Sequence, residues 1–301
     1  MILAIGEILF DNFQNYRRVG GAPFNFSYHL KKLGFSAHFL TRVGTDPDGE
    51  ELGRILENGG FDRKDLQVDP DHRSGKVNVT VVGKGIPIFD IVPDVAFDHL
   101  AFDGRVKALL QDGPELIYYG TLIQRTLKGR RFMEEVFFAA GETARFFCDV
   151  NLRPGCWSQE MVEASLARAD VLKLNEEELE TIITFPEVNL SRDDPCRSLM
   201  EHYSIEMVAL TRGEQGSEIH SNRGSHSIGP VQDQAVADTV GAGDAYASIL
   251  AIGYLGGWEP ERILAAASRF SAALCGIKGA LPGSDEFYGE YKDLLGEKAN
   301  G

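Results

Sequence analysis

Short apolar runs alternate along the chain with longer stretches in which apolar residues recur every three or four positions. The short runs predict strands at residues 2–5, 38–43, 116–119, 145–149, 171–174 and 207–211. The longer stretches predict helices at residues 23–33, 50–57, 124–140, 160–168, 176–184, 244–256 and 259–277. This alternation is typical of an α/β fold with a mostly parallel central sheet and helices on both faces.

The alternation of predicted strands and helices is interrupted between residues 75 and 92. Apolar and polar residues alternate over 76–82, a Gly-Lys-Gly turn signal follows at 83–85, and a second β-rich run covers 86–92. Two strands joined by a turn form a hairpin, whereas neighbouring parallel strands need a long crossover. We therefore expect this hairpin to lie outside the parallel layer.

Composition and charge narrow the classes of function. The chain has 301 residues, of which 43% are hydrophobic, enough for a large core. Its 45 acidic and 30 basic residues give a net charge of −15, which disfavours a nucleic acid or a membrane as partner. Four scattered cysteines without a C-x-x-C pair, and a start that lacks the pattern of a signal peptide, predict a cytoplasmic protein with reduced thiols.

The strongest chemical signal is the segment Asp238-Thr-Val-Gly-Ala-Gly-Asp244, which directly precedes a predicted helix. Its glycines let the backbone approach a ligand closely, and the first amides of a helix bind anions, so the segment suits a phosphate group. The carboxylate of Asp244 can take a proton from a hydroxyl nucleophile, or it can simply complement the helix dipole. The chain has no P-loop, and the G-x-G-x-x-G pattern fails at Tyr246.

Polar residues also follow the first predicted strand. Asp11 is placed at its end, and Gly20-Gly-Ala-Pro-Phe-Asn25 opens the first helix, with Pro23 in its first turn. Asp11 and Asn25 can offer a carboxylate and an amide to a polyol, or they can merely turn and cap the chain.

Three further segments each follow a predicted strand: Asp149-Val-Asn-Leu-Arg-Pro154, Asn175-Glu-Glu-Glu178 and Thr211-Arg-Gly-Glu-Gln-Gly216. The side chains of Asn175 and Glu178 share one helix face and can reach a hydrated Mg²⁺, or they can form a capping box. The segment from Thr211 can also be a plain hairpin. Because open α/β sheets bind ligands beyond the carboxyl ends of their strands, these sites together favour phosphoryl transfer.

In this order, and over nearly the whole chain, the motifs resemble those of the PfkB, or ribokinase-like, family of ATP-dependent sugar kinases. The resemblance rests on the two glycine-rich signatures at residues 20–25 and 238–244, an N-x-x-E motif at 175–178 and a T-x-G-x-x-G segment at 211–216. It implies a single ribokinase-like domain over residues 1–301, with a small β lid formed by about 11–20 and 73–93. It also implies a sugar and ATP as substrates, Mg²⁺ and K⁺ as cofactors, and a homodimer formed through the lid.

The resemblance also assigns roles to particular residues. Asp244 is implied as the catalytic base, and the anion hole as Gly241, Ala242 and Gly243. The residues implied to bind the sugar are Asp11, Gly20, Gly21, Asn25, Asn151 and Arg153. Those implied to bind the nucleotide are Asn175, Thr211, Gly213 and Gly216. The implied metal ligands are Asn175 and Glu178 for Mg²⁺ through water, and Asp238 and Val240 for a monovalent cation.

The sugar is less sharply indicated. The segments 6–11 and 149–157 are most similar to the fructokinase branch, followed by 2-keto-3-deoxygluconate kinases. Arg153 can clamp the carboxylate of an acid sugar, contact a phosphate of ATP or serve the structure. Phe24, Phe26 and Phe89 can line the sugar pocket or pack in the core. A nucleoside kinase and a non-catalytic sugar- or nucleotide-binding regulator remain alternatives.

Overall fold

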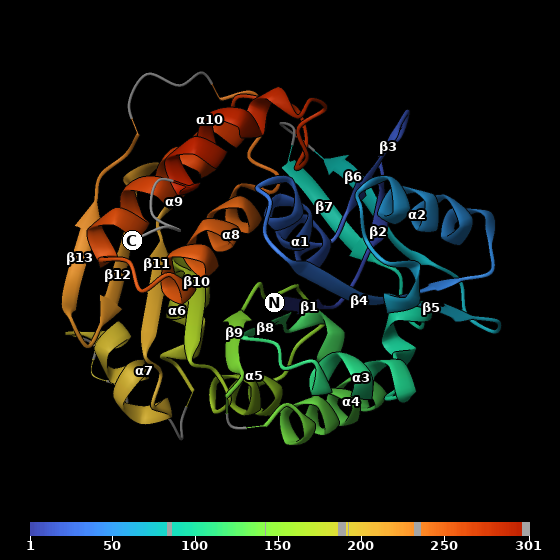
Figure 1. The fold of residues 1–301 in the computed structure, drawn as a ribbon, viewed down its shortest axis with the longest axis horizontal. Coiled ribbons are helices and arrows are strands. Elements are labelled where there is room, and N and C mark those ends of the chain that lie inside the picture. Colours follow the sequence, from blue (N-terminus) through green and yellow to red (C-terminus); the bar gives the residue numbers. More distant parts are fainter. Residues whose placement is uncertain (83–85, 142, 186–190, 192, 232–235, 297–301) are drawn as a thin grey trace.

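The computed structural model describes residues 1–82, 86–141, 143–185, 191, 193–231 and 236–296. Its centre is a nine-stranded sheet in the order β13-β12-β11-β10-β9-β8-β1-β4-β5 (Figure 1). Neighbouring strands from β11 to β5 pair in parallel, and the pairs β11–β12 and β12–β13 are antiparallel. In chain order these strands are β1 (Ile2–Ile5), β4 (Ala37–Gly44), β5 (Leu66–Asp69), β8 (Leu116–Gly120), β9 (Arg145–Asp149), β10 (Val171–Asn175), β11 (Met207–Thr211), β12 (Ser217–Ser221) and β13 (Gly224–Ile228).

The order of the strands reverses beside β1. From β1 the sheet grows in one direction through β4 and β5, and in the other direction from β8 onward. Such a reversal opens a crevice outside the carboxyl ends of the two strands that flank it, here β1 and β8, and ligands of open α/β sheets bind there.

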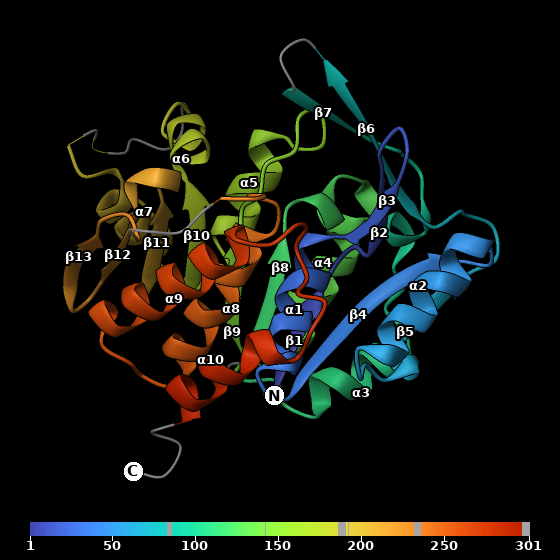
Figure 2. The same cartoon turned by 90° about the horizontal axis from the view of Figure 1, so that it is seen from above.

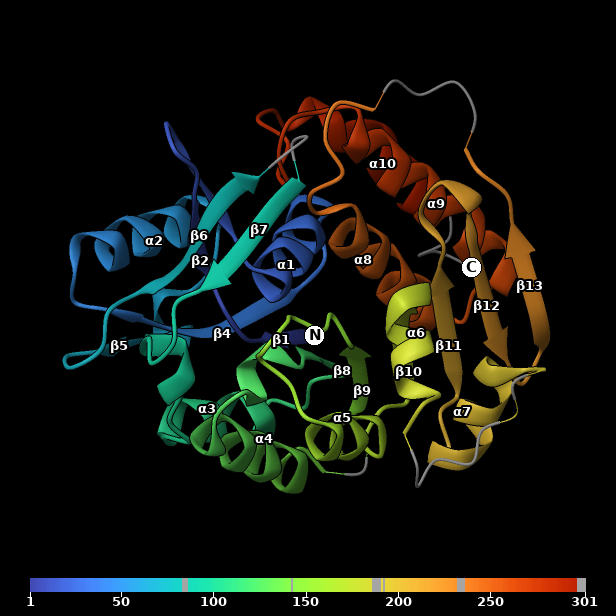
Figure 3. The ribbon, with the colours of Figure 1, turned by 180° about the vertical axis from the view of Figure 1, so that it is seen from behind.

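Helices cover both faces of the sheet, as Figures 1 and 3 show from opposite sides. One face carries α1 (Ala22–Lys32), α2 (Pro47–Asn58), α8 (Ala242–Leu255), α9 (Pro260–Cys275) and α10 (Glu286–Gly296). The other carries α3 (Gly104–Gln111), α4 (Leu127–Ala139), α5 (Gln159–Leu166), α6 (Glu176–Ile182) and α7 (Pro195–Tyr203). Strand β1 shows why two cores form: its alternate residues point to opposite faces, so Leu3 and Ile5 join one core and Ala4 the other.

A second, four-stranded sheet has the order β3-β2-β6-β7. Its strands are β2 (Leu9–Asn12), β3 (Arg17–Gly20), β6 (Gly75–Val82) and β7 (Ile86–Ile91). Strands β2 and β6 pair in parallel, whereas β2–β3 and β6–β7 are antiparallel. Figure 2 shows β6 and β7 extending beyond the end of the main sheet that lies opposite the N-terminus.

The predicted α/β fold with a hairpin outside the parallel layer is confirmed. The hairpin is β6–β7, and its predicted turn at 83–85 lies outside the described residues. The predicted helix at 124–140 begins only at Leu127, because Leu122–Gln124 forms a 3₁₀ turn and the hydroxyl of Thr126 caps α4. The strands β5 and β13 and the helices α3, α7 and α10 were not predicted. Strands β2 and β3 fall in or beside the segment of about 11–20 that the resemblance implied as part of a β lid, and β12 belongs to the hairpin that was the alternative for residues 211–216.

Candidate active site

A cavity of about 380 Å³ opens beyond the carboxyl ends of the main-sheet strands, against the small sheet and the start of α8. It brings together most of the residues predicted from the sequence. Those that line it are Asp11, Gly20, Gly21, Asn25, Asn151, Arg153, Asn175, Glu178, Thr211, Val240, Gly241, Gly243 and Asp244. Ala242, Gly213, Gly216 and Asp238 are not among the lining residues.

The predicted anion loop forms the start of α8. Gly241 is the N-cap residue, with a left-handed backbone at φ 81°, and a Cβ atom built there would lie 2.4 Å from the Cβ of Ala280. Both the conformation and the close approach require glycine. Ala242 is the first residue of the helix, and its amide donates a hydrogen bond of 3.3 Å to the carbonyl oxygen of Thr239. Among the described residues, the amides of Gly243 and Asp244 have no backbone partner and can bind an anion.

Asp244 lies in the first turn of α8, with its carboxylate part-buried. The side-chain amide of Asn25 donates a hydrogen bond of 2.8 Å to Oδ2 of Asp244, which leaves Oδ1 available to a ligand. Burial and the nearby charge of Asp149 raise the pKa of Asp244 to about 7, although Asn25, Lys173 and Arg153 act in the opposite direction. A carboxylate whose pKa lies near neutral pH is well matched to general-base catalysis.

Asn25 itself is 4% exposed, and its Oδ1 has no hydrogen-bond partner among the described residues. A buried acceptor without a partner is costly to leave unsatisfied. Because the residue lines the cavity, a hydroxyl group of a bound ligand can supply the missing donor.

A buried ion pair lies beneath the loop. Lys173 of β10 is the register partner of Asp149 of β9, and its Nζ donates a hydrogen bond of 2.8 Å to Oδ1 of Asp149. Tyr118 donates a second one, of 3.0 Å, to Oδ2 of Asp149. Burial alone would lower the pKa of Lys173, but the carboxylates of Asp149 and Glu178 outweigh it and raise the pKa, which keeps the amine charged.

This ammonium group also lies beside Gly243 of the predicted anion loop. A Cβ atom built on Gly243 would lie 3.3 Å from Nζ of Lys173. Gly243 therefore lets a buried positive charge reach the start of α8, where the helix dipole already favours an anion.

Two further carboxyl groups line the cavity. Glu7, two residues after the end of β1, is 5% exposed, and burial raises its pKa to about 7. Burial also raises the pKa of Asp11 to about 6, while Arg153 and Arg18 act in the opposite direction.

The predicted position of Asp11 at the end of the first strand is wrong. Strand β1 ends at Ile5, and Asp11 belongs to β2 of the small sheet, where it is the register partner of Arg18. The small sheet, rather than the main one, thus presents this carboxylate to the cavity.

Asn175 and Glu178 form the capping box that the sequence allowed, and both also line the cavity. Glu178 accepts hydrogen bonds from the backbone amides of Leu152 (2.9 Å) and Asn175 (2.8 Å), one on each carboxylate oxygen. Each oxygen keeps a further lone pair. This donor set fits a Mg²⁺ ion that keeps its own water molecules, since Mg²⁺ prefers carboxylate ligands and loses water reluctantly.

Only part of the predicted nucleotide-binding segment lines the cavity. Thr211, at the end of β11, lines it, and Gly213 and Gly216 lie in the turn that joins β11 to the antiparallel β12. The segment is thus a hairpin, as its alternative interpretation stated. A Cβ atom built on Gly216 would lie 2.0 Å from the carbonyl oxygen of Ile228, so this glycine serves the packing of the hairpin.

Asn151 has a left-handed backbone at φ 43°, a conformation that asparagine tolerates better than most residues and that is concentrated at functional sites. Of the three aromatic candidates, Phe24 and Phe26 are fully buried in the core, whereas Phe89 of β7 lines the cavity.

Asp238, which was predicted with Val240 to hold a monovalent cation, has a carboxylate that is hydrogen-bonded within the protein. Oδ2 of Asp238 accepts hydrogen bonds from Arg18 (2.7 Å) and from the amide of Gly279 (3.0 Å). Oδ1 accepts another from the amide of Val240 (3.2 Å). Burial would raise the pKa of Asp238, but these donors lower it. The guanidinium group of Arg18 thus supplies the positive charge at this carboxylate.

Glu7 and Lys173 line the cavity but were not among the predicted site residues, and the pairing of Asp149 with Lys173 was not predicted. Glu7 lies two residues after the end of the first strand, so the rule that selected the other sites applied to it as well. Lys173 interrupts an otherwise apolar strand, and a lysine in such a place is rarely buried without a partner. Its pairing with Asp149, however, depends on strand register.

Comparison with known proteins identifies the family of the chain. Residues 6–286 match the pfkB family of carbohydrate kinases. Fructokinase-2 of Solanum lycopersicum is 25% identical over 310 residues, covering 94% of this chain and 92% of that protein. The structure of an uncharacterized sugar kinase from Pyrococcus horikoshii in complex with ATP is 24% identical, with a TM-score of 0.79 over 93% of this chain and 94% of that one.

A fructokinase from Vibrio cholerae, solved with fructose, ADP and calcium ion bound, is 23% identical, with a TM-score of 0.76 over 95% of this chain and 97% of that one. These likenesses agree with the ribokinase-like fold described above. Since the family match spans most of the chain, the protein belongs to the pfkB family of carbohydrate kinases and is a phosphotransferase.

Proposed function

We propose that the protein is an ATP-dependent fructokinase, which transfers the γ-phosphoryl group of ATP to a hydroxyl group of fructose. One observation carries the proposal: a single cavity holds the anion-binding turn at Gly241, the base Asp244 and the unpartnered acceptor of Asn25. The similarity to a plant fructokinase supports the choice of sugar, and the ATP complex of the Pyrococcus protein supports the nucleotide.

The chemistry follows from the positions of these groups. Amides at the start of α8 bind the phosphoryl group, and the buried ammonium of Lys173 beside Gly243 stabilises its negative charge. Oδ1 of Asp244 takes the proton of the sugar hydroxyl, while Asn25 holds Oδ2. The small sheet contributes Asp11 and Phe89 to the sugar side of the cavity.

Mg²⁺ belongs to this proposal, with Asn175 and Glu178 as the residues that would hold it through water. The ion would neutralise charge on the phosphates of ATP. A monovalent cation at Asp238 and Val240 is not included, because Arg18 already pairs with that carboxylate. Dimerisation through the small sheet and a cytoplasmic location stay predictions. The part of the chain that the structure describes contains no helix able to cross a bilayer.

A second candidate is a 2-keto-3-deoxygluconate kinase. Two arginines, Arg18 and Arg153, line the cavity, and a guanidinium group can bind a sugar carboxylate through two parallel hydrogen bonds. Arg18 is already paired with Asp238, and Arg153 lies near the carboxyl groups of Glu7 and Asp11, so both charges have partners without an acid sugar. This arrangement favours a neutral sugar.

The test is the release of ADP from Mg-ATP, measured by a coupled assay with fructose, ribose, 2-keto-3-deoxygluconate, adenosine and inosine. We expect the highest kcat/KM with fructose. A preference for the keto acid would establish the second candidate, and a preference for a nucleoside would place the protein among nucleoside kinases. Turnover of none of these compounds, with binding retained, would indicate a regulator and overturn the proposal.

A further inference from the structure

A second group of metal-binding side chains lies away from the cavity, where the chain passes between the main body and the small sheet. His72 is in the segment that leads from β5 into β6, and Asp94 and His99 are in the segment that leaves β7. Backbone hydrogen bonds hold these two segments together, from Ala96 to Arg73 (2.7 Å) and from Val92 to Lys76 (3.0 Å). None of the three side chains lines the cavity.

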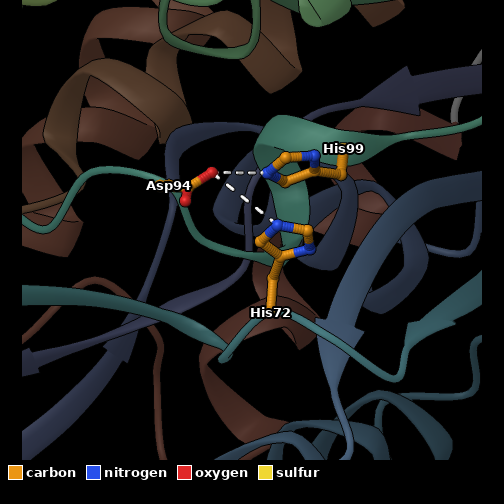
Figure 4. Close-up of side chains that lie close together, drawn as sticks. All are labelled: His72, Asp94 and His99. Atoms are coloured by element: carbon orange, nitrogen blue, oxygen red, sulfur yellow. Dashed lines mark hydrogen bonds and ion pairs between the residues drawn. The ribbon is translucent and has the colours of Figure 1, made fainter.

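The three side chains lie close together. Figure 4 shows the imidazole rings of His72 and His99 stacked on one another, each with a nitrogen directed at the carboxylate of Asp94. The ring centroids are 3.5 Å apart and the planes differ by 17°, so the rings must turn out of this stack to bind one ion together. Oδ1 of Asp94 lies 2.8 Å from Nε2 of His99 and 3.8 Å from Nε2 of His72. One ligand atom from each residue lies within 4.8 Å of the other two. A tetrahedral ion with bonds of 2.0–2.1 Å separates its ligand atoms by about 3.3 Å, so the observed spacings lie on either side of that value.

The surroundings of His72 favour the tautomer that a metal ligand needs. Its Nδ1 lies 3.0 Å from Oδ1 of Asp69, a carboxylate that is 1% exposed. This contact places the ring proton on Nδ1 and leaves the lone pair of Nε2 directed at Asp94, which is too far away for a hydrogen bond. A carboxylate behind the histidine is the usual support of a metal-binding imidazole.

The neighbour of His99, Lys128, opposes metal binding. Nζ of Lys128 lies 2.9 Å from Nδ1 of His99, and when Nε2 binds a metal ion that Nδ1 carries a proton and cannot accept a hydrogen bond. Lys128 is exposed and can turn into the solvent, but its charge opposes a cation. The structure therefore predicts that removal of this lysine strengthens metal binding.

We propose that His72, Asp94 and His99 form a binding site for a divalent transition-metal ion, separate from the catalytic cavity. Two imidazole nitrogens and one carboxylate oxygen suit Zn²⁺, Co²⁺ or Ni²⁺ and not Mg²⁺. The bound ion joins the two segments that connect the small sheet to the body. The inference does not depend on which sugar the enzyme phosphorylates.

The test uses the full chain, freed of metal with a chelator and kept in excess Mg²⁺ so that the catalytic cavity does not take up the probe. Zn²⁺ binding is measured by calorimetry, and Co²⁺ binding by its visible absorption. We expect one equivalent of either ion. His99→Gln and Asp94→Asn should each weaken binding by about 100-fold or more, since each removes one of three ligands. Lys128→Gln should strengthen it by about two- to fivefold at low salt.

His202→Gln, at an exposed histidine on α7, is the matched control and should bind as the unchanged chain does. Asp94 is 76% exposed, so its replacement should leave the fold intact, and circular dichroism verifies this. Absence of Zn²⁺ and Co²⁺ binding would overturn the proposal. So would binding that Asp94→Asn and His99→Gln leave unchanged, because the ion would then lie elsewhere.

Discussion

The protonation of Asp244 should set the pH dependence of phosphoryl transfer. In the proposed mechanism the residue acts as a base only when ionised, and burial together with the charge of Asp149 raises its pKa from 3.8 to about 7. At pH 6 only about one-tenth of the enzyme then carries the active base, and at pH 8 about nine-tenths does. We expect kcat/KM for the sugar to rise about tenfold per unit below pH 7 and to level off above it.

Two substitutions test this role: one removes the carboxylate of Asp244, and the other changes its pKa. Asp244→Asn removes the base and should lower kcat by about 10²- to 10⁴-fold while the fold survives. Asp149→Asn removes the neighbouring negative charge and leaves Lys173 without its partner, and both changes favour the ionised form of Asp244. The midpoint of the profile should therefore move to lower pH.

The assay is the initial rate of ADP release between pH 5 and 9, with Mg-ATP saturating and the sugar varied. Glu7→Gln is the matched control, since Glu7 lines the same cavity and its pKa is also raised to about 7. That variant should keep both the slope and a midpoint near pH 7. A flat profile in the unchanged enzyme, an Asp244→Asn rate within tenfold of normal, or loss of the slope in Glu7→Gln would refute the assignment.

Three further predictions concern stability, measured by urea unfolding. Gly241→Ala should cost about 2–4 kcal/mol, because φ is 81° and the new Cβ would overlap that of Ala280, whereas Gly104→Ala, with nothing within 4 Å, should be close to neutral. Lys173→Met should cost about 3–5 kcal/mol by leaving Asp149 buried without its partner, and adding Asp149→Asn should restore part of that loss. Between pH 4.5 and about 7, Glu7 binds more protons in the folded than in the unfolded chain, so its contribution to stability falls as pH rises. On going from pH 5 to pH 8, Glu7→Gln should therefore gain about 2–3 kcal/mol of stability relative to the unchanged protein. An equal stability difference at both pH values would contradict the buried state of Glu7.

Periodicity in the sequence identified the strands that are buried on both faces, such as β8 and β10, and the long helices α8 and α9. It failed for four-residue strands such as β2, β3 and β5, because so short a segment shows no clear period and is held by partners distant in the chain. Asp11 was assigned to the wrong strand for this reason.

The residues of the candidate site also differ in whether the sequence alone could identify them. The glycines and Asp244 of the segment 238–244 could be identified from the sequence, because a tight turn into a helix is a local property of the chain. The contact between Lys173 and Asp149 could not, because 24 residues separate them and only the register of β9 with β10 brings them together. The pairing of Arg18 with Asp238, across 220 positions, likewise depends on how the small sheet packs against the start of α8.

The alternation of strands and helices and the glycine turn at the start of α8 could thus be predicted from the sequence alone, since both follow from backbone preferences within a few residues. Three other properties depend on the tertiary structure: which charges are neutralised, which carboxyl groups are buried deeply enough to titrate near neutral pH, and which histidines lie side by side. Those properties depend on solvent exclusion and on distances between segments, and neither is encoded in any single stretch of the chain.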